Sequence, residues 1–454
     1  MPVPPSNDPE DAAQAPQDSG ASGLGGLGLG SAPRAAATLG ALWLLVFAAA
    51  SQTIIITPVL PIIGEALRVD LGVLGTLVPA YSWALAAAAL LMGPVSDRVG
   101  RRRVLLIGSG ALAGALALHG LAASFEALLA ARVLAGACGG VLSGAAVSYV
   151  GDAVPYNRRG WATGLVMSAV PVGLVLGVPV GRVLAAGLGF RVPFLAFAGL
   201  MALSFLLVLA VVPQPDVKLE TSRLDARAFA RGYLGLLRDA GNRAAALTYF
   251  LMYLGLGLFV VMLPQWITDT QPLAVEIAGE PVELFGLPVD FIATLFSVGG
   301  LASFVVGPWA GALSDRAGRK PMVLASCAGL FLVMGSVTYV VGEARWALYP
   351  VYIVTMAMFA LRASPLQALI TALVPGRQRG TLMSLVIALG QIGTGLGGAI
   401  GGALYAGAGF RTVSLVAAAT SAVLAVAVWL TLPEPTEDAQ AVGAPAEPDA
   451  LAPA

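Results

Sequence analysis

Two short charged segments carry the residues best suited to chemistry in this chain of 454 residues. Both have the pattern Gly-x-x-x-Asp-Arg-x-Gly-Arg, and both interrupt long apolar runs. A carboxylate beside arginines, in a turn that glycine allows to be tight, forms ion pairs that can break and re-form. This pattern predicts a gate and not a catalytic centre. The gating residues are Gly93, Asp97, Arg98, Gly100 and Arg101 in the first segment, and Gly311, Asp315, Arg316, Gly318 and Arg319 in the second.

Each aspartate of the gate needs a positive partner. A helix N-terminus carries a partial positive charge, and the pattern predicts helices that begin at Gly160 and Gly380. We therefore expect Asp97 to bind the helix that begins at Gly380, and Asp315 the one that begins at Gly160. The alternative is that both turns only anchor the topology of the chain.

Arg132 lies inside the fourth apolar run, where a charged side chain points to a function. At helical spacing it shares one face with Gly136, Gly139, Gly140 and Ser143, whose small size lets a second helix approach closely. We therefore predict a functional role for Arg132 within the membrane. A snorkelling arginine near the membrane interface is the alternative.

The tenth apolar run presents a second candidate face, formed by Tyr352, Met356, Phe359 and Arg362. Arg362 lies near the middle of the run, where a charge needs an acceptor or a watery cavity. We predict that this face lines an amphipathic substrate pocket. Weaker candidates for the same pocket, each of which could instead bond a neighbouring helix, are Gln52 and Thr53 in the first run, Tyr253 in the seventh and Gln391 in the eleventh.

Gly173, Gly177 and Gly181 recur every four residues in the fifth run, and Pro179 interrupts its last part. A glycine face with a proline kink predicts close and bendable helix packing. Plain packing without a directional role fits the spacing equally well.

Acidic residues are absent from the middle third of every apolar run. A transported proton would therefore have to use Asp97, a displaced Glu126, the single histidine His119, or the substrate itself. Three embedded arginines without embedded acids suit an anionic or zwitterionic substrate better than a cation. Those arginines are Arg132, Arg182 and Arg362.

The elements that must position these residues are apolar runs long enough to cross a bilayer. Of the whole chain 58% is hydrophobic and only 11% is charged, and backbone in lipid is satisfied within helices. We predict an all-α membrane protein with twelve transmembrane helices. The runs are 38–63, 71–95, 104–124, 127–150, 160–186, 191–213, 243–267, 290–313, 320–342, 346–374, 380–406 and 410–432.

The order of landmarks predicts two pseudo-symmetric six-helix halves. Arg159–Gly160 and Arg379–Gly380 are 220 residues apart, as are Gly189 and Gly409. We expect an N-terminal half at 38–213 and a C-terminal half at 243–432. We expect the linker at 214–242 to hold a helix on the membrane surface or a solvated segment, and the tails at 1–37 and 433–454 to be disordered.

Basic residues set the predicted orientation. With both tails inside, the inner segments hold eighteen of them and the outer segments four, so both termini are expected in the cytoplasm. The longest outer loop, 269–289, alternates apolar and polar residues around Ala278–Gly279, which predicts a small hairpin. It acts either as a lid or as a simple exposed loop.

Several classes of function find no support in the sequence. A net charge of zero does not favour binding to nucleic acid. Two cysteines and one histidine are too few to predict a metal cluster or a disulfide framework. No phosphate-binding loop of the Gly-x-x-x-x-Gly-Lys-Ser/Thr type is present, which argues against ATP-driven pumping. We expect no cofactor and no enzymatic activity.

The two gating segments resemble the signature turn of the major facilitator superfamily. The resemblance of the chain to this family covers residues 38–432. The motif around Arg132 is similar to the fourth-helix motif of that family, in which the arginine is associated with proton coupling. The resemblance therefore implies a coupling role for Arg132. The stretch from Gly173 to Gly181 looks like the motif of its drug:proton antiporter branch, except that Arg182 stands where a further glycine is usual.

The resemblance implies a monomeric carrier in the cell membrane that works by alternating access. It implies proton-coupled efflux of a small amphipathic molecule. Two alternatives stay open: a facilitator or carrier of an organic anion or lysolipid, and a membrane sensor or scaffold that transports nothing.

Overall fold

The computed structural model describes residues 31–215, 226–277, 280–284, 286–342, 344–372 and 376–432. Most of the predicted tails therefore lies outside the described residues. Residues 31–37 are the exception, because the first helix begins at Ala32 and takes in Pro33, Arg34 and three alanines ahead of the apolar run.

The described chain is almost entirely helical. The N-terminal half contains α1 (Ala32–Ile54), α2 (Ile56–Leu67), α3 (Leu71–Leu74), α4 (Leu77–Val99), α5 (Arg101–Leu121), α6 (Phe125–Leu142), α7 (Ala145–Ala153), α8 (Tyr156–Met167), α9 (Ala169–Val172), the π-helical segment η2 (Gly173–Gly177), α10 (Val178–Leu188) and α11 (Arg191–Val211). The linker contains α12 (Ala226–Leu236). The C-terminal half contains α13 (Ala240–Thr270), α14 (Phe291–Ala317), α15 (Arg319–Val341), the 3-10 turn η3 (Arg345–Ala347), α16 (Leu348–Ala372) and α17 (Gly376–Thr431).

Among the described residues, eleven helices are long and apolar enough to cross a membrane. The last of them, Thr381–Thr431, has 51 residues and would be about 75 Å long if straight, whereas a bilayer core is about 30 Å thick. It turns at Gly409, whose φ of 72° and ψ of 176° are not helical. The eleven candidates therefore make twelve crossings, as predicted.

Four runs that read as continuous are broken in the structure: the first, second, fourth and fifth. The first is interrupted at Ile55, between α1 and α2. Pro58 has no N–H to bond the carbonyl of Ile54, which accounts for the break. The fourth run is interrupted at Gly144, which adopts a left-handed conformation with φ of 74°.

The two halves share backbone geometry at equivalent positions. Gly100 and Gly318 have φ of 97° and 89°, each with ψ of 139°. Gly189 and Gly409, which are 220 residues apart, have φ of 93° and 72°. These angles are open to glycine and strained for other residues, so the same turn is built twice. This geometry confirms the predicted pseudo-symmetry.

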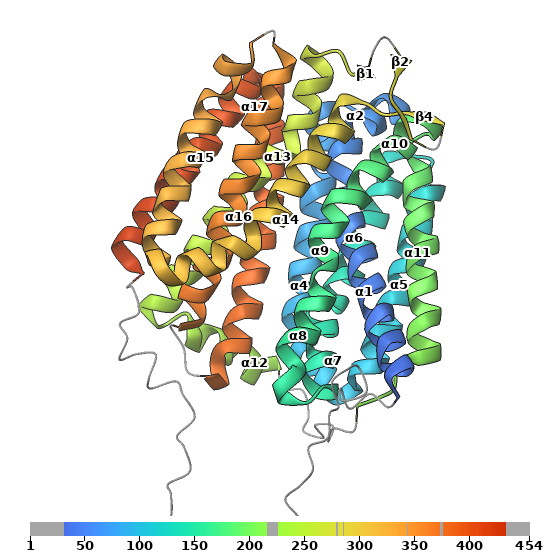
Figure 1. Cartoon of the computed structure of the whole chain (residues 1–454), viewed down its shortest axis with the longest axis vertical. Helices are drawn as coiled ribbons and strands as arrows, with labels where there is room; N and C mark the ends of the chain where they lie inside the picture. Colours follow the sequence, from blue (N-terminus) through green and yellow to red (C-terminus); the bar gives the residue numbers. More distant parts are fainter. Residues whose placement is uncertain are drawn as a thin grey trace, which may run out of the picture.

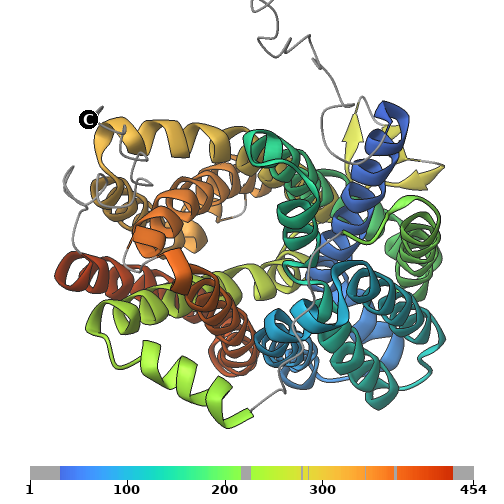
Figure 2. The same cartoon turned by 90° about the horizontal axis from the view of Figure 1, so that it is seen from below.

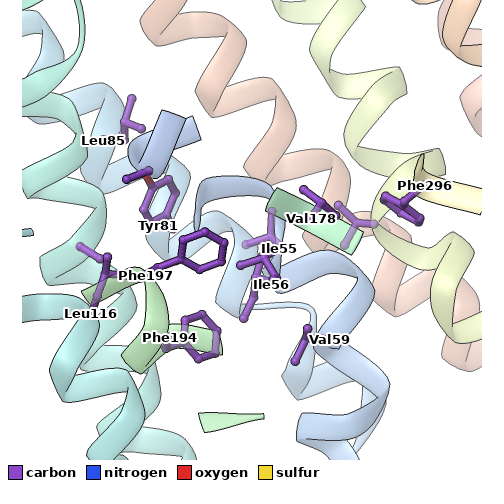
Figure 3. Close-up of a cluster of buried hydrophobic side chains, with 14 of the residues drawn as sticks. Ile55, Ile56, Val59, Tyr81, Leu85, Leu116, Val178, Phe194, Phe197 and Phe296 are labelled. Carbon is purple, nitrogen blue, oxygen red and sulfur yellow. The ribbon is translucent and has the colours of Figure 1, made fainter. Parts of the chain in front are cut away.

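Both views of the molecule show two helical bundles side by side (Figures 1 and 2). We call the end that carries the short strands the hairpin end, and the end that carries α12 the linker end. Apolar side chains fill the interior of the N-terminal bundle, and Figure 3 shows the part of this core around the break at Ile55, with Ile56, Phe194 and Phe197 close by.

The predicted hairpin is confirmed. Strand β1 (Glu276–Ile277) pairs with β2 (Glu280–Pro281) in antiparallel register. A second hairpin, β3 (Glu283–Leu284) with β4 (Leu287–Pro288), follows it and was not predicted.

The linker also forms a helix, α12, in which the Tyr233 hydroxyl donates to the Leu90 carbonyl of α4 at 3.4 Å. Burial raises the pKa of Tyr233 above its ordinary value. The position of α12 on the membrane surface stays a prediction.

Candidate transport cavity and gates

A cavity of about 310 Å³ lies between the two halves. Both halves contribute to its wall, which is largely apolar with a few polar groups. A volume of this size suits a small organic molecule. The lining residues are Thr53, Ile54, Ile56, Thr57, Val78, Tyr81, Ser82, Arg132 and Leu174 from the N-terminal half, and Tyr253, Leu256, Gly257, Val260, Val261, Phe296, Gly300, Tyr352, Met356, Gln391 and Thr394 from the C-terminal half.

The structure brings together most of the residues predicted for the substrate pocket. Tyr253, Tyr352, Met356 and Gln391 line the cavity together with Arg132, whose predicted role was coupling. Three predicted residues are not part of the lining that the structure describes: Gln52, Phe359 and Arg362.

Gln52 lies behind the wall and helps to fix it. Its side-chain amide donates to the Tyr81 hydroxyl at 2.8 Å, and the Thr53 hydroxyl lies 2.7 Å from the same oxygen. The Tyr81 ring is thereby held in place, and the Arg132 guanidinium lies over it at 4.5 Å from the ring centre. Tyr81 was missed in the sequence, although it is the only tyrosine in the second apolar run.

Small residues on α6 explain how Arg132 reaches the cavity. A Cβ atom at Gly136 would lie 2.2 Å from the Tyr81 carbonyl oxygen, and one at Gly140 would lie 2.5 Å from the Leu85 carbonyl oxygen. Only glycine permits α6 to pack this closely on α4. The close approach places Arg132 directly against the Tyr81 ring.

Arg362 is buried in the C-terminal half. Its Nη2 donates to the Met252 carbonyl at 3.3 Å, and its guanidinium stacks over the Phe359 ring at 4.5 Å. Its acceptor Met252 directly precedes Tyr253, which does line the cavity. Arg362 therefore lies behind the C-terminal wall.

The glycine stripe of the fifth span packs on α1. A Cβ atom at Gly177 would lie 2.1 Å from the Ser51 hydroxyl, and one at Gly181 would lie 1.6 Å from the Ile55 side chain. A Cβ atom at Gly173 would also meet Ser51, and Pro179 is the second residue of α10, which follows the π-helical segment. The equivalent glycines of the other half, Gly393, Gly397 and Gly401, pack on α13 in the same way.

Arg182 forms an ion pair between the halves at the hairpin end. Its Nη2 and Nε lie 2.6 and 2.7 Å from one carboxylate oxygen of Asp290, and its Nη1 donates to the Pro58 carbonyl at 2.6 Å. The other oxygen of Asp290 accepts from the Ala293 amide and caps α14. Both side chains are largely buried. We call this contact between the two halves the hairpin-end lock. The sequence signal was present: Arg182 occupies the register of Gly402 in the repeat.

At the linker end, the structure describes only part of the predicted gate. The side chains of Asp97 and Asp315, and the surroundings of Gly93 and Gly311, lie outside the described residues. Arg101 is bonded within its own half, to Asp152 at 2.6 Å and to Ser96 at 2.8 Å. The remaining arginines lie on the same turns, with Arg98 before Gly100 and Arg316 and Arg319 flanking Gly318.

The predicted helix starts at Gly160 and Gly380 were wrong. The helices begin four residues earlier, at Tyr156 for α8 and at Gly376 for α17. Arginines are good helix formers, so the helix extends beyond the apolar run into the charged segment. Any positive helix end opposite Asp97 or Asp315 is therefore displaced by a turn.

Several described contacts join the two halves between mid-membrane and the hairpin end. The Trp83 indole donates to the Ile392 carbonyl at 3.3 Å, and Gly300 packs against Leu174 and Val175. Nearer the hairpin end, Gly75 approaches Gly398. Towards the linker end the bundles diverge (Figure 1). The molecule is therefore in a state that is closed at the hairpin end.

Known proteins are similar to this chain in sequence and in fold. The family model of the Major Facilitator Superfamily matches residues 42–244 and 245–453. The multidrug resistance protein MdtG of Enterobacter lignolyticus is 27% identical over 386 residues, which cover 83% of this chain and 87% of the relative. MdtG of Proteus mirabilis is 26% identical and covers 77% of this chain and 83% of the relative.

Solved structures agree on the fold. A D-xylose-proton symporter superposes with a TM-score of 0.72 at 16% identity and covers 88% of this chain and 98% of its own. A bacterial homologue of the lysosomal transporter Spinster, in an inward-facing and unoccupied conformation, gives 0.69 at 16% identity and covers 88% of this chain and 98% of its own. The chain belongs to the Major Facilitator Superfamily of membrane transporters.

Proposed function

We propose that this secondary transporter exports small amphipathic molecules through the cavity between its halves, in exchange for protons. The observation that carries the proposal is the cavity itself, because both halves line it and its wall combines an apolar surface with a buried cation and hydroxyl groups. A site at the interface of two bundles becomes exposed to alternate sides when the bundles rock. Each chain contains a whole cavity, which supports action as a monomer.

The two ends carry different closing devices in this proposal. The hairpin-end lock holds the observed state. The turns with Asp97 and Asp315 close the linker end in the opposite state, when the bundles have rocked. The distribution of basic residues supports a cytoplasmic linker end, with both termini inside the cell.

The relatives support export as the direction of transport. Proteins named for multidrug resistance match more than three quarters of this chain at 26–27% identity. In the proposal the proton is carried by Asp97, Glu126, His119 or the cargo. His119 is buried near the hairpin end, where its Nδ1 lies 2.7 Å from the Ala115 carbonyl.

Transport into inside-out vesicles tests this function. Vesicles with an acidic interior should accumulate a fluorescent amphipathic drug, and a protonophore should abolish the accumulation. Met356→Trp fills the cavity and should remove the activity, whereas Leu332→Trp on the lipid-facing side of α15 should keep it. Accumulation that persists without a proton gradient contradicts antiport, and equal loss in both variants contradicts the assignment of the cavity.

A further inference from the structure

The buried guanidinium of Arg132 lacks hydrogen-bond acceptors. Its side chain is 0% exposed, and neither Nε nor Nη1 has a hydrogen-bond partner. A buried guanidinium without acceptors is costly, because it has lost water and gained little in return. The other two embedded arginines are better supplied: Arg182 bonds through three nitrogens and Arg362 bonds a carbonyl.

Among the described residues that line the cavity, none carries a charge opposite to that of Arg132. Arg132 is the one charged side chain in this described lining, and the rest is apolar, aromatic, hydroxyl or amide in character. On the same helix, Glu126 is exposed and lies six residues away from Arg132. Asp290 is already committed to Arg182. Charge balance therefore has to come from what enters the cavity.

The surroundings hold the guanidinium ready for such a partner. The Tyr81 ring covers one face of it at 4.5 Å, and Gln52 and Thr53 fix the ring through its hydroxyl. Stacking on a ring leaves the N–H groups in the plane of the guanidinium unused. Those donors match the planar fork of a carboxylate.

A second cation strengthens the positive potential. Arg362 is 1% exposed, and its Nε also has no hydrogen-bond partner. It donates to the carbonyl of Met252, the residue that precedes the cavity-lining Tyr253. Each half therefore holds one buried positive charge, Arg132 at the wall of the cavity and Arg362 behind it.

We propose that the cargo is an amphipathic organic anion whose carboxylate binds Arg132 and whose apolar body packs against Phe296, Val260 and Met356. The proposal rests on the function proposed above, for which it specifies the class of substrate. Binding of the anion supplies the acceptors that Arg132 lacks. A cationic drug would add a third positive charge to the two that are already buried.

Binding to the purified protein in detergent tests the proposal with three probes that share one ring system. The probes are 1-naphthylacetate, its neutral amide 1-naphthylacetamide, and the cation 1-naphthylmethylammonium. We expect the anion to raise the Tm and to bind at least tenfold more tightly than either of the others. Preference for the amide or the cation overturns the proposal, and this comparison needs no variant.

Variants then locate the charge. Arg132→Gln should lower the affinity for 1-naphthylacetate at least tenfold and remove its preference over the amide, and Arg132→Lys should restore part of that preference. Arg103→Gln, at an exposed arginine of the linker end, should leave binding unchanged. Should Arg132→Gln fail to fold, the comparison of wild-type protein with Arg132→Lys still decides.

Two further outcomes separate the possibilities. Lysophosphatidylglycerol is an anionic single-chain lipid, and protection by this lipid without protection by 1-naphthylacetate overturns the assignment to a small organic acid. Binding is measured without a gradient, so anion binding in the absence of proton-driven flux contradicts the proposed function alone. Proton-driven export of cations without anion binding contradicts this inference alone.

Discussion

At the scale of single residues, Tyr81 connects the first span to the arginine of the cavity. Its hydroxyl is bonded by Gln52 and Thr53 on α1, and its ring supports Arg132 on α6. Three helices therefore meet at one side chain. The ring and the hydroxyl have separable roles, which a single substitution can distinguish.

Tyr81→Phe keeps the ring and removes the hydroxyl. Buried polar groups of Gln52 and Thr53 lose a partner, so we expect the free energy of unfolding to fall by about 1–3 kcal/mol. Thermal unfolding in detergent measures the change. The control is Tyr339→Phe, at a residue that is 60% exposed and whose hydroxyl accepts from the exposed Arg411. Because water can replace this bond, the change should alter stability by no more than about 0.5 kcal/mol. An equal loss in both variants would show that the bonds to Gln52 and Thr53 contribute nothing.

The sequence located the charged residues of the site but not their partners. Arg132 stands out as a charge in an apolar run, and the glycines that follow it predict a close helix contact. Which residue lies beneath the guanidinium depends on the register of α4 against α6, which no local pattern encodes. For the same reason the sequence does not reveal that Arg182 pairs with Asp290, because the two residues are 108 positions apart in the chain.

At the scale of elements, glycine faces set how closely the spans pack. The fifth and eleventh spans each press such a face onto the first helix of their own half, α1 or α13. In the eleventh span the atoms opposite are mostly backbone, including the carbonyls of Phe250 and Leu254. Backbone cannot move aside as a flexible side chain can, so these positions tolerate little added volume.

Gly397→Ala tests this packing. A Cβ atom there would lie 2.4 Å from the Leu254 carbonyl oxygen, and the overpacking should cost about 1–3 kcal/mol of stability. Gly199→Ala has no atom within 4 Å of the new Cβ, so it should gain up to about 1 kcal/mol from helix propensity. Opposite shifts of the Tm in the two variants are the expected result. A gain in both would mean that α17 moves freely away from α13.

Most elements followed from their apolar runs, and the departures have local causes. Apolar length and the charged turns predict twelve crossings and two halves, and the structure has both. The break at Ile55 follows from Pro58, a signal that was available in the sequence. The starts of α8 and α17 were predicted four residues too late, because each helix begins in the charged segment before the apolar run.

At the scale of the whole molecule, the hairpin-end lock holds the two bundles in the observed state. Asp290 belongs to the C-terminal half and Arg182 to the N-terminal half, so this buried pair must separate before the hairpin end can open. Separation moves both charges towards water. The pair therefore favours the closed hairpin end only while its two members are together and charged.

Asp290→Asn removes the charge and keeps the helix cap, since asparagine also accepts from the Ala293 amide. It leaves Arg182 buried without a counter-ion, a change that costs about 3–5 kcal/mol in comparable pairs. The closed hairpin end should lose stability by a large part of that amount. Asp269→Asn is the matched control, because Asp269 bonds Tyr405 and Gln265 within one half.

Distances between spin labels test this account most directly. In a chain without Cys138 and Cys327, one labelled pair spans the hairpin end at Leu121 and Val340, and another spans the linker end at Leu209 and Trp429, all of them exposed positions. We predict that Asp290→Asn lengthens the hairpin-end distance and shortens the linker-end distance, while Asp269→Asn resembles the unsubstituted chain. Unchanged distances at both ends in Asp290→Asn would contradict alternating access controlled by this lock.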